Sequence, residues 1–348
     1  MSETTWTSSA SSHLSVDMTT TDVTQITGGN IMTSSSSRGA EFYFQCAVML
    51  IGIVGTATNA LILYAMVASK QHKKHVLIFN QNVLDLFSSV FTTVTYSVKL
   101  CNIHLTGSVG YWLCTVVLSE SLLTCTMVGS VINLAAIIVE RYLKIVHSAW
   151  SKNKQHKWMT YLAVAFAWIA SIIYNLPLVF CTTVVVDGVC YAYAIWVNAT
   201  VRIIQVISSF VTFYVIVLLI FIFCYWRILA VIRRQASVMA GHSAAGSSAA
   251  QTLQSNQIQL NVIKTMILVS AFYAISWLPH YICVLLLHLN PNPTLYSVYH
   301  VTVVIIFLYI CTNPFIYAIK FDPVKKILLD KFSCKKNSQQ AAENVANT

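Results

Sequence analysis

The feature of this sequence that most limits its fold is a series of long stretches without Asp, Glu, Lys or Arg. Such stretches are residues 42–69, 158–186, 203–226 and 265–319. A helix needs about 20 apolar residues to cross the roughly 30 Å hydrocarbon core of a bilayer. Each of the first three stretches is long enough for one crossing, and the fourth is long enough for two. The chain is therefore predicted to be an all-α membrane protein.

Two further stretches and one turn bring the number of spans to seven. Residues 75–98 contain a single charge, Asp85, near their middle, and roughly residues 110–140 form another apolar stretch. The long stretch 265–319 is interrupted by Asn290-Pro291-Asn292-Pro293, a strong turn signal. The sequence therefore predicts a seven-transmembrane helix bundle.

The charges support this count and orient the bundle. Only 9% of the 348 residues are charged, against about a quarter in a typical soluble domain. Of 21 Lys and Arg, all but Arg38, Lys99 and Arg202 follow spans one, three or five or lie in the tail. The positive-inside rule then places the N-terminus outside the plasma membrane and the C-terminus in the cytosol. Attraction to anionic inner-leaflet lipid accounts for the net charge of +10 without nucleic acid.

Three regions follow from this topology. Residues 1–41, rich in Ser and Thr and without an apolar run, are predicted to be a disordered extracellular arm rather than a signal peptide. Residues 42–320 form the bundle, in which residues 235–257 are predicted to be a flexible cytosolic loop. Residues 321–348 are predicted to form a short amphipathic eighth helix and a cytosolic tail. Cys334, after that helix, is a candidate for palmitoylation, with an unmodified thiol as the alternative.

The sequence contains no recognisable catalytic or zinc-binding motif, so we expect the protein not to be an enzyme. Its ten Cys include no C-x-x-C pair, and no H-E-x-x-H occurs. The segment Gly241-His-Ser243-Ala-Ala-Gly246 misses G-x-S-x-G by one residue and is interpreted as linker. Asn198-Ala-Thr200 is the one N-x-S/T sequon and is predicted to carry the N-glycan.

Polar residues inside the spans mark a candidate ion site. Ionisable groups in lipid are costly and tend to face the bundle interior, which makes Asp85 the clearest functional candidate. Four polar residues that could converge on it are Asn59, Ser130, Asn133 and Asn313. A carboxylate among amide and hydroxyl oxygens suits Na⁺ or a proton. The alternative is a single structural carboxylate, and no other metal site is expected.

Three short motifs stand at or inside span ends. They are Glu140-Arg141-Tyr142, Trp277-Leu278-Pro279 and Asn313-Pro314-Phe315-Ile316-Tyr317. An exposed acid–base pair is worth little by itself. A proline inside a membrane helix removes a backbone hydrogen bond and kinks the helix, which can provide a hinge.

In their order and separation these residues resemble rhodopsin-like (class A) G-protein-coupled receptors over about residues 42–333. The matching positions, in chain order, are Asn59, Asp85, Glu140-Arg141-Tyr142, Lys144-Ile145-Val146-His147, Trp168 with Pro177, Tyr225, Trp277-x-Pro279 and Asn313-Pro314-x-x-Tyr317. The resemblance implies a receptor that binds an extracellular ligand and catalyses nucleotide exchange on a heterotrimeric G protein. Arrestin and membrane lipids would be further partners, and no cofactor is implied beyond an allosteric Na⁺.

The resemblance also implies roles for individual residues. The G-protein switch would comprise Glu140, Arg141, Tyr142, Tyr225, Asn313, Pro314 and Tyr317. The sodium pocket would comprise Asp85, Ser130 and Asn313. Arg141 is expected to pair with Glu140 in the inactive state and to meet the two switch tyrosines, Tyr225 and Tyr317, on activation. Cys114 would form a disulfide with Cys190.

The sequence departs from the family pattern at three positions. Val217 replaces the fifth-helix proline, and Tyr273 replaces the usual sixth-helix phenylalanine. Cys114 lies about two residues further from Arg141 than is usual, which suggests a bulge or a different disulfide partner. Cys101 and Cys181 are the spare candidates, and the sequence does not choose between them.

The ligand can be narrowed mainly by exclusion. Leu123 occupies the position of the acid that binds amines, with Glu120 nearly one turn higher, and Phe307 occupies the position of the retinal-binding lysine. The predicted pocket comprises Tyr96, Leu123, Met127, Phe210, Phe213, Trp277, His280, Tyr281, Tyr299 and Phe307. A peptide or a small, weakly charged molecule fits this pocket best. The alternatives are an atypical amine receptor and, from another class, a multi-pass transporter, although no internal repeat supports the latter.

Overall fold

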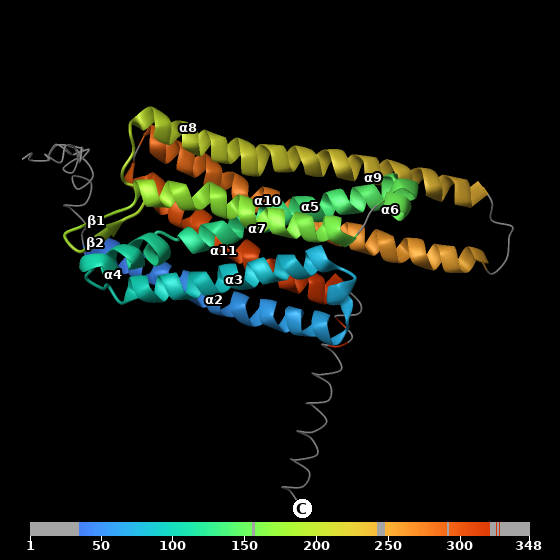
Figure 1. Cartoon of the computed structure of the whole chain (residues 1–348), viewed down its shortest axis with the longest axis horizontal. Helices are drawn as coiled ribbons and strands as arrows, with labels where there is room; N and C mark the ends of the chain where they lie inside the picture. Colours follow the sequence, from blue (N-terminus) through green and yellow to red (C-terminus); the bar gives the residue numbers. More distant parts are fainter. Residues whose placement is uncertain are drawn as a thin grey trace, which may run out of the picture. The chain divides into compact units, whose positions relative to one another are not determined.

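The computed structural model describes residues 35–154, 157–241, 248–290 and 292–320, together with Lys325 and Ile327. The chain divides into two units, Met1–Glu41 and Phe42–Thr348, and the helical bundle belongs to the second unit. Figure 1 shows its long helices running side by side, some parallel and some antiparallel to one another.

The described residues contain seven long helical segments, which confirms the predicted bundle. These segments are α2 (Ser35–Ala68), α3 (Val76–Leu100), α5 (Ser121–Val146), α7 (Lys157–Thr182), α8 (Ala199–Phe210) continued through η3 (Val211–Val215) into α9 (Ile216–Gly241), α10 (Ser248–Leu289) and α11 (Pro293–Lys320). The short elements between them are η1 (Gln71–Lys73), α4 (Gly107–Trp112), η2 (Leu113–Leu118), α6 (Ser148–Lys154), β1 (Val184–Val186) and β2 (Val189–Tyr191).

Six of the seven segments are apolar enough to be identified as membrane spans by composition alone, and α3 is not among them. With 25 residues, α3 is long enough to cross a bilayer. Its polar residues are buried inside the bundle: Asn80, Gln81, Asn82, Asp85, Ser88, Ser89, Thr92 and Thr95. The polar face of α3 therefore forms the interior of the protein, while its apolar residues face lipid or other helices.

Helix α5 lies at the centre of the packing. It contacts α3, α7 and α9, and α10 packs along α11. Leu123, Leu134 and Ile138 of α5 are buried in the main core together with aromatic side chains from α9, α10 and α11. Because dense packing leaves few alternative side-chain arrangements, this core fixes the helices that carry the site residues.

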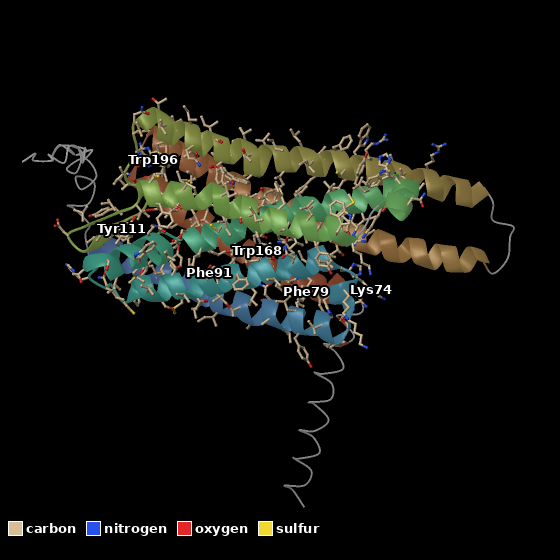
Figure 2. The ribbon with its side chains drawn as sticks, in the orientation of Figure 1. Lys74, Phe79, Phe91, Tyr111, Trp168 and Trp196 are labelled. Carbon is tan, nitrogen blue, oxygen red and sulfur yellow. A yellow bond between two sulfur atoms is a disulfide. The ribbon has the colours of Figure 1, made fainter. Side chains whose placement is uncertain are left out.

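We name the two ends of the bundle after residues they contain. The disulfide end holds Cys114 and Cys190, and the arginine end holds Arg141. Figure 2 shows Lys74 and Phe79 near the arginine end and Tyr111 near the disulfide end.

Two predicted boundaries differ from the structure. The helix of the fourth span ends at Thr182, and the remaining apolar residues form a hairpin in which Val185 pairs with Cys190. The predicted flexible loop 235–257 is mostly helical, since α9 extends to Gly241 and α10 begins at Ser248. The Ala and Gln residues in that segment favour helix, which explains the second error.

Two predictions fall on residues that the structure leaves undescribed. Of the predicted amphipathic helix, only Lys325 and Ile327 are described, and both are helical. Cys334 and the first 34 residues lie outside the described part of the chain. The interpretation of these regions stays a prediction.

Candidate functional site

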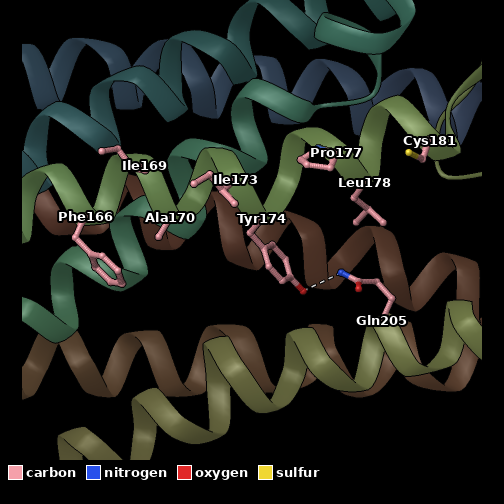
Figure 3. Close-up of a pocket in the computed structure, with 9 residues that line it drawn as sticks. All are labelled: Phe166, Ile169, Ala170, Ile173, Tyr174, Pro177, Leu178, Cys181 and Gln205. Atoms are coloured by element: carbon pink, nitrogen blue, oxygen red, sulfur yellow. Dashed lines mark hydrogen bonds between the residues drawn. The ribbon is translucent and has the colours of Figure 1, made fainter.

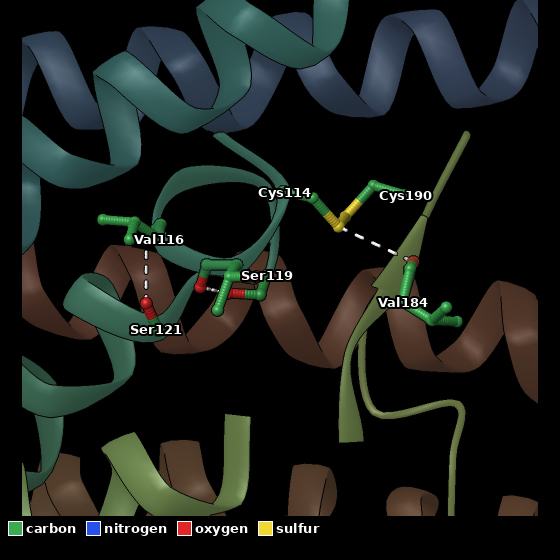
Figure 4. The surroundings of a disulfide bond; sticks show 7 residues. Cys114, Val116, Ser119, Ser121, Val184 and Cys190 are labelled. Atoms are coloured by element: carbon green, nitrogen blue, oxygen red, sulfur yellow. Dashed lines mark hydrogen bonds between the residues drawn. A yellow bond between two sulfur atoms is a disulfide. The ribbon is translucent and has the colours of Figure 1, made fainter. Parts of the chain in front are cut away.

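A disulfide anchors the segment in front of α5. Cys114 in η2 is bonded to Cys190 in β2, with 5.4 Å between the Cα atoms, and the Cys114 side chain is fully buried (Figure 4). The alternative cysteines, Cys101 and Cys181, are free and exposed. The structure therefore contains the disulfide pairing implied by the family resemblance.

The same segment contains the bulge that the unusual spacing between Cys114 and Arg141 suggested. Residues Leu113–Leu118 form a π-helix, and Glu120 then adopts a left-handed conformation with φ of 61° before α5 begins. A π turn holds more residues than an α turn, which accounts for a longer spacing between Cys114 and Arg141. Figure 4 shows Ser121 donating a hydrogen bond to the carbonyl of Val116, at 2.9 Å, so a side chain replaces the interrupted backbone ladder.

The break positions Glu120 against Lys99 of α3. The Lys99 ammonium lies 2.5 Å from a Glu120 carboxylate oxygen and 4.7 Å from the centre of the Tyr96 ring. Tyr193, in the loop after β2, is close enough to be affected: burial, followed by the negative charge of Glu120, raises the pKa of Tyr193 to about 12. Lys99 and Glu120 thus neutralise one another beside the Tyr96 ring.

Most of the predicted ligand residues gather in two aromatic groups at the disulfide half of the bundle. In the first, Tyr281 lies between Phe210 and Trp277, with ring centres 5.4 Å and 5.8 Å away. In the second, the Tyr96 and Phe307 rings meet edge to face at 5.9 Å.

Further contacts link α10 to α11. The His280 and Tyr299 rings lie 5.6 Å apart, and His280 Nδ1 is 3.3 Å from the Thr302 hydroxyl. Leu123 is fully buried and Met127 packs partly buried against the same core. Phe213 differs, because its ring contacts Tyr174 of α7 at 4.7 Å and so points away from the two aromatic groups.

Two aromatic residues in these contacts were absent from the predicted pocket. Phe44 of α2 lies 4.4 Å from the His300 ring and 6.0 Å from the Tyr96 ring. Tyr214 stacks on Phe210 at 5.5 Å. Both sit in apolar stretches, where their sequence context does not separate pocket residues from lipid-facing ones.

A cavity of about 780 Å³ lies elsewhere, between α7 and α8 (Figure 3). Its lining comprises Phe166, Ile169, Ala170, Ile173, Tyr174, Pro177, Leu178, Cys181 and Gln205. Phe166 and Ile173 are 62% and 67% exposed, as expected of side chains that face lipid. Gln205 donates a hydrogen bond to the Tyr174 hydroxyl at 2.9 Å inside it. None of the predicted ligand residues lines this cavity, so it is distinct from the two aromatic groups.

The predicted sodium-pocket residues do converge on Asp85, which is completely buried. One carboxylate oxygen accepts hydrogen bonds from Ser130 at 2.8 Å and from Gln81 at 3.3 Å. The other accepts from the Asn313 amide at 2.9 Å. Gln81 was not predicted, although it precedes Asp85 by four residues and therefore shares its helix face.

Asn133 and Asn59 occupy different places from those expected. Asn133 is linked to Asp85 only through Gln81, since its amide donates a hydrogen bond to the Gln81 side chain at 2.8 Å. Asn59 bonds instead to the carbonyl of Gly55, at 2.9 Å. The amide oxygens of Asn59 and Asn313 are buried and have no hydrogen-bond partner among the described residues. Such oxygens, with the Asp85 carboxylate and the Ser130 hydroxyl, are ligands that suit a hard monovalent cation.

At the arginine end the pairing of charges differs from the prediction. Glu140 binds Lys144 at 2.7 Å, one helical turn further along α5. Arg141 Nη2 instead lies 3.1 Å from Nδ1 of His75, immediately before α3. The expected Arg141–Glu140 pair is thus not among the ion pairs of the described residues. The physical reason is that residues four apart share a helix face, whereas neighbours do not.

The other switch residues can be placed in part. Tyr142 OH is 3.2 Å from His147 Nε2, and Tyr225 OH is 2.9 Å from the Ser270 hydroxyl. Pro314 lies inside α11, beside the fully buried Asn313. Tyr317 belongs to the same helix, but its side chain is outside the described part of the structure.

The two departures in the fifth and sixth helices are structurally related. The π-helical segment η3 forms although Val217, and not proline, follows it. Tyr273 is fully buried, and its hydroxyl donates a hydrogen bond to the carbonyl of Phe213 in η3. Tyr214 of η3 donates in return to the carbonyl of Ala274 at 3.1 Å. These two tyrosines therefore connect the widened turn to α10.

Comparisons with known proteins agree with this geometry. Rat (Rattus norvegicus) galanin receptor type 1 is 25% identical over 311 residues, covering 85% of this chain and 84% of the relative. Rat somatostatin receptor type 4 is 24% identical over 289 residues, covering 81% and 70%. Melanopsin-A of Gadus morhua is 26% identical over 298 residues, covering 82% and 52%.

Structural and family comparisons lead to the same conclusion. The crystal structure of squid rhodopsin superposes with a TM-score of 0.70 at 17% identity, covering 85% of this chain and 86% of that one, which shows a shared fold. The family described as 7 transmembrane receptor (rhodopsin family) matches residues 58–317. The chain belongs to this rhodopsin family of seven-transmembrane receptors, and it is a G-protein-coupled receptor for an extracellular ligand.

Proposed function

We propose that the receptor is activated by an extracellular peptide. The observation that carries this proposal is the Glu120–Lys99 ion pair, which lies beside Tyr96 of the predicted ligand pocket. The one acid near the predicted pocket is already neutralised, and Leu123 stands where amine receptors carry theirs. A free monoamine would therefore find no unpaired carboxylate among the described pocket residues. The galanin and somatostatin receptors among the relatives support a peptide as the ligand class.

A retinal ligand is disfavoured for a separate reason. Phe307 stands at the position of the lysine that would form a Schiff base, and its ring packs against Tyr96. The similarity to a melanopsin therefore extends to the fold and not to the chromophore chemistry.

The ligand class can be tested in cells that express the full chain with a panel of Gα reporters. Peptide, monoamine and retinal libraries would be compared at equal receptor surface levels. We expect peptide responses that Trp277→Ala weakens, because Trp277 lies beneath the proposed pocket in contact with Tyr281. A monoamine that activates the receptor with no response to any peptide would contradict the proposal.

We further propose a plasma-membrane orientation with the disulfide end outside and the arginine end in the cytosol. The distribution of Lys and Arg supports this orientation, as does the position of Asn198, which is exposed before α8.

The Asn198 side-chain oxygen caps α8 by accepting a hydrogen bond from Val201 N at 2.8 Å. A glycan attaches to the amide nitrogen, so glycosylation leaves this cap intact. Glycosidase treatment should shift the wild-type chain and leave Asn198→Gln unchanged. Arrestin and inner-leaflet lipid would bind at the cytosolic end.

The buried polar site is proposed to bind Na⁺ in the inactive state. Asp85, Ser130 and the amide oxygen of Asn313 would be its ligands. Agonist and sodium would then oppose one another through a single conformational equilibrium, with coupling of about 5–150-fold in affinity. Agonist affinity should fall with NaCl but not with choline chloride, and Asp85→Asn should abolish that dependence. An equal sodium effect in both proteins would exclude this site.

A further inference from the structure

His75 contacts the central residue of the switch from a neighbouring helix. It immediately precedes α3, and its Nδ1 lies 3.1 Å from Nη2 of Arg141, which is 66 positions further along the sequence. A guanidinium group has no acceptor, so Arg141 must be the donor and Nδ1 the acceptor. The imidazole is therefore neutral, with its proton on Nε2.

The charges around His75 favour this neutral form. Burial, followed by the positive charges of Arg141 and Lys144, lowers the pKa of His75 from its ordinary value to about 4. Lys74 acts in the same direction, and Glu140 opposes these effects only in part. At cytosolic pH the histidine is therefore an acceptor and not a second cation.

The surrounding contacts give His75 a restraining role. Glu140 is engaged by Lys144, and the Tyr225 hydroxyl bonds to Ser270 of α10. Arg141 and Tyr225 are expected to meet on activation, and here each holds a different partner. We therefore assign the hydrogen bond between Arg141 and His75 to the inactive state, in which Arg141 and Tyr225 do not contact each other.

We propose that His75 is a positioning residue that holds Arg141 in the inactive state, the role the sequence assigned to Glu140. This inference rests on the G-protein switch and not on the proposed ligand class. Activation would require Arg141 to leave an acceptor on α3, so the stability of the inactive state depends on two helices rather than on α5 alone.

The functional test measures basal exchange of a non-hydrolysable GTP analogue on membranes that carry the full chain and a panel of Gα proteins. His75→Phe keeps the ring but removes the acceptor, and it should raise the basal rate about tenfold, the change in ratio that corresponds to about 1.4 kcal/mol. His75→Asn keeps an acceptor near Nδ1 and should stay close to wild type. His75→Leu replaces the Phe variant should the latter not reach the surface.

Two matched measurements separate this role from a general structural one. Glu140→Gln removes the acid that bonds Lys144 and should change basal exchange less than His75→Phe does. Imidazole NMR of histidine-labelled receptor in lipid discs should show a neutral His75 with the proton on Nε2, assigned by its loss in His75→Asn. The proposal is overturned by unchanged basal exchange in His75→Phe at matched surface level, by a larger effect of Glu140→Gln, or by a proton on Nδ1. Basal exchange needs no ligand, so an error in the ligand class leaves this test intact.

Discussion

At the disulfide end, α5 is preceded by a π-helical turn and a left-handed break at Glu120, whereas at the arginine end it continues as regular α-helix to Val146. The irregular end is fixed from outside the helix, by the Cys114–Cys190 bond and the Lys99–Glu120 ion pair. The regular end depends on exchangeable side-chain hydrogen bonds such as that between Arg141 and His75. Fixed contacts thus shape the end at which we propose that the ligand binds, and exchangeable contacts lie at the end with the proposed switch.

The largest expected effect is the loss of stability on removing the Cys114–Cys190 disulfide. The double variant Cys114→Ala/Cys190→Ala removes this cross-link between residues 76 positions apart. A loop of that length corresponds to a loss of about 4.5 kcal/mol of stability. Thermal unfolding of the purified receptor would measure the loss, and Cys101→Ser, at a free exposed cysteine, is the control. Equal melting temperatures in all three proteins would show that the bond does not hold this end.

A second experiment addresses the regular end. Arg141→Ala removes the fork of donors that a G protein and the switch tyrosines would engage. Agonist-stimulated nucleotide exchange should fall at least about tenfold, or about 1.4 kcal/mol, while ligand binding and surface level are retained. Lys157→Ala, which removes an exposed charge near the same end, serves as control. Full exchange by Arg141→Ala would refute the assigned switch.

The smallest effect is expected at the Glu120 break. The Lys99 and Glu120 side chains are 27% and 29% exposed, so their ion pair is partly screened by solvent. A double-mutant cycle of Glu120→Gln and Lys99→Met, followed by thermal unfolding, should give a coupling of roughly 0.2–1 kcal/mol. A coupling of zero would mean that the disulfide alone positions this segment, and a value above the range would mean that the pair is more strongly desolvated than its exposure indicates.

The sequence predicted those features that follow from periodicity and spacing. The thickness of the bilayer requires about 20 apolar residues per span, so the number of spans could be counted from the sequence. Asp85 stood out because a charge in a span is costly, and its contacts with Ser130 and Asn313 followed the expected pocket.

Other contacts between helices could not be predicted from the sequence. Gln81 could have been found, since it lies one turn from Asp85 on the same face. His75 could not, because a histidine at a helix start gives no indication of which residue on another helix it faces. The pairing of Glu140 was wrong for a related reason: adjacency in sequence was given more weight than the four-residue spacing that joins it to Lys144.

The buried polar face of α3 has a consequence for how the protein is made. A carboxylate at the centre of an isolated helix costs about 2.5–3.5 kcal/mol on insertion into the membrane, and the three consecutive amides Asn80, Gln81 and Asn82 add to that cost. Apart from Gln81 of α3 itself, the groups that hydrogen-bond to Asp85 belong to α5 and α11, which are synthesised later. We therefore expect a nascent chain that ends after α3 to insert this helix incompletely, and elongation through α5 to rescue it. Correct insertion of the second span would thus be an outcome of tertiary assembly and not of its own hydropathy.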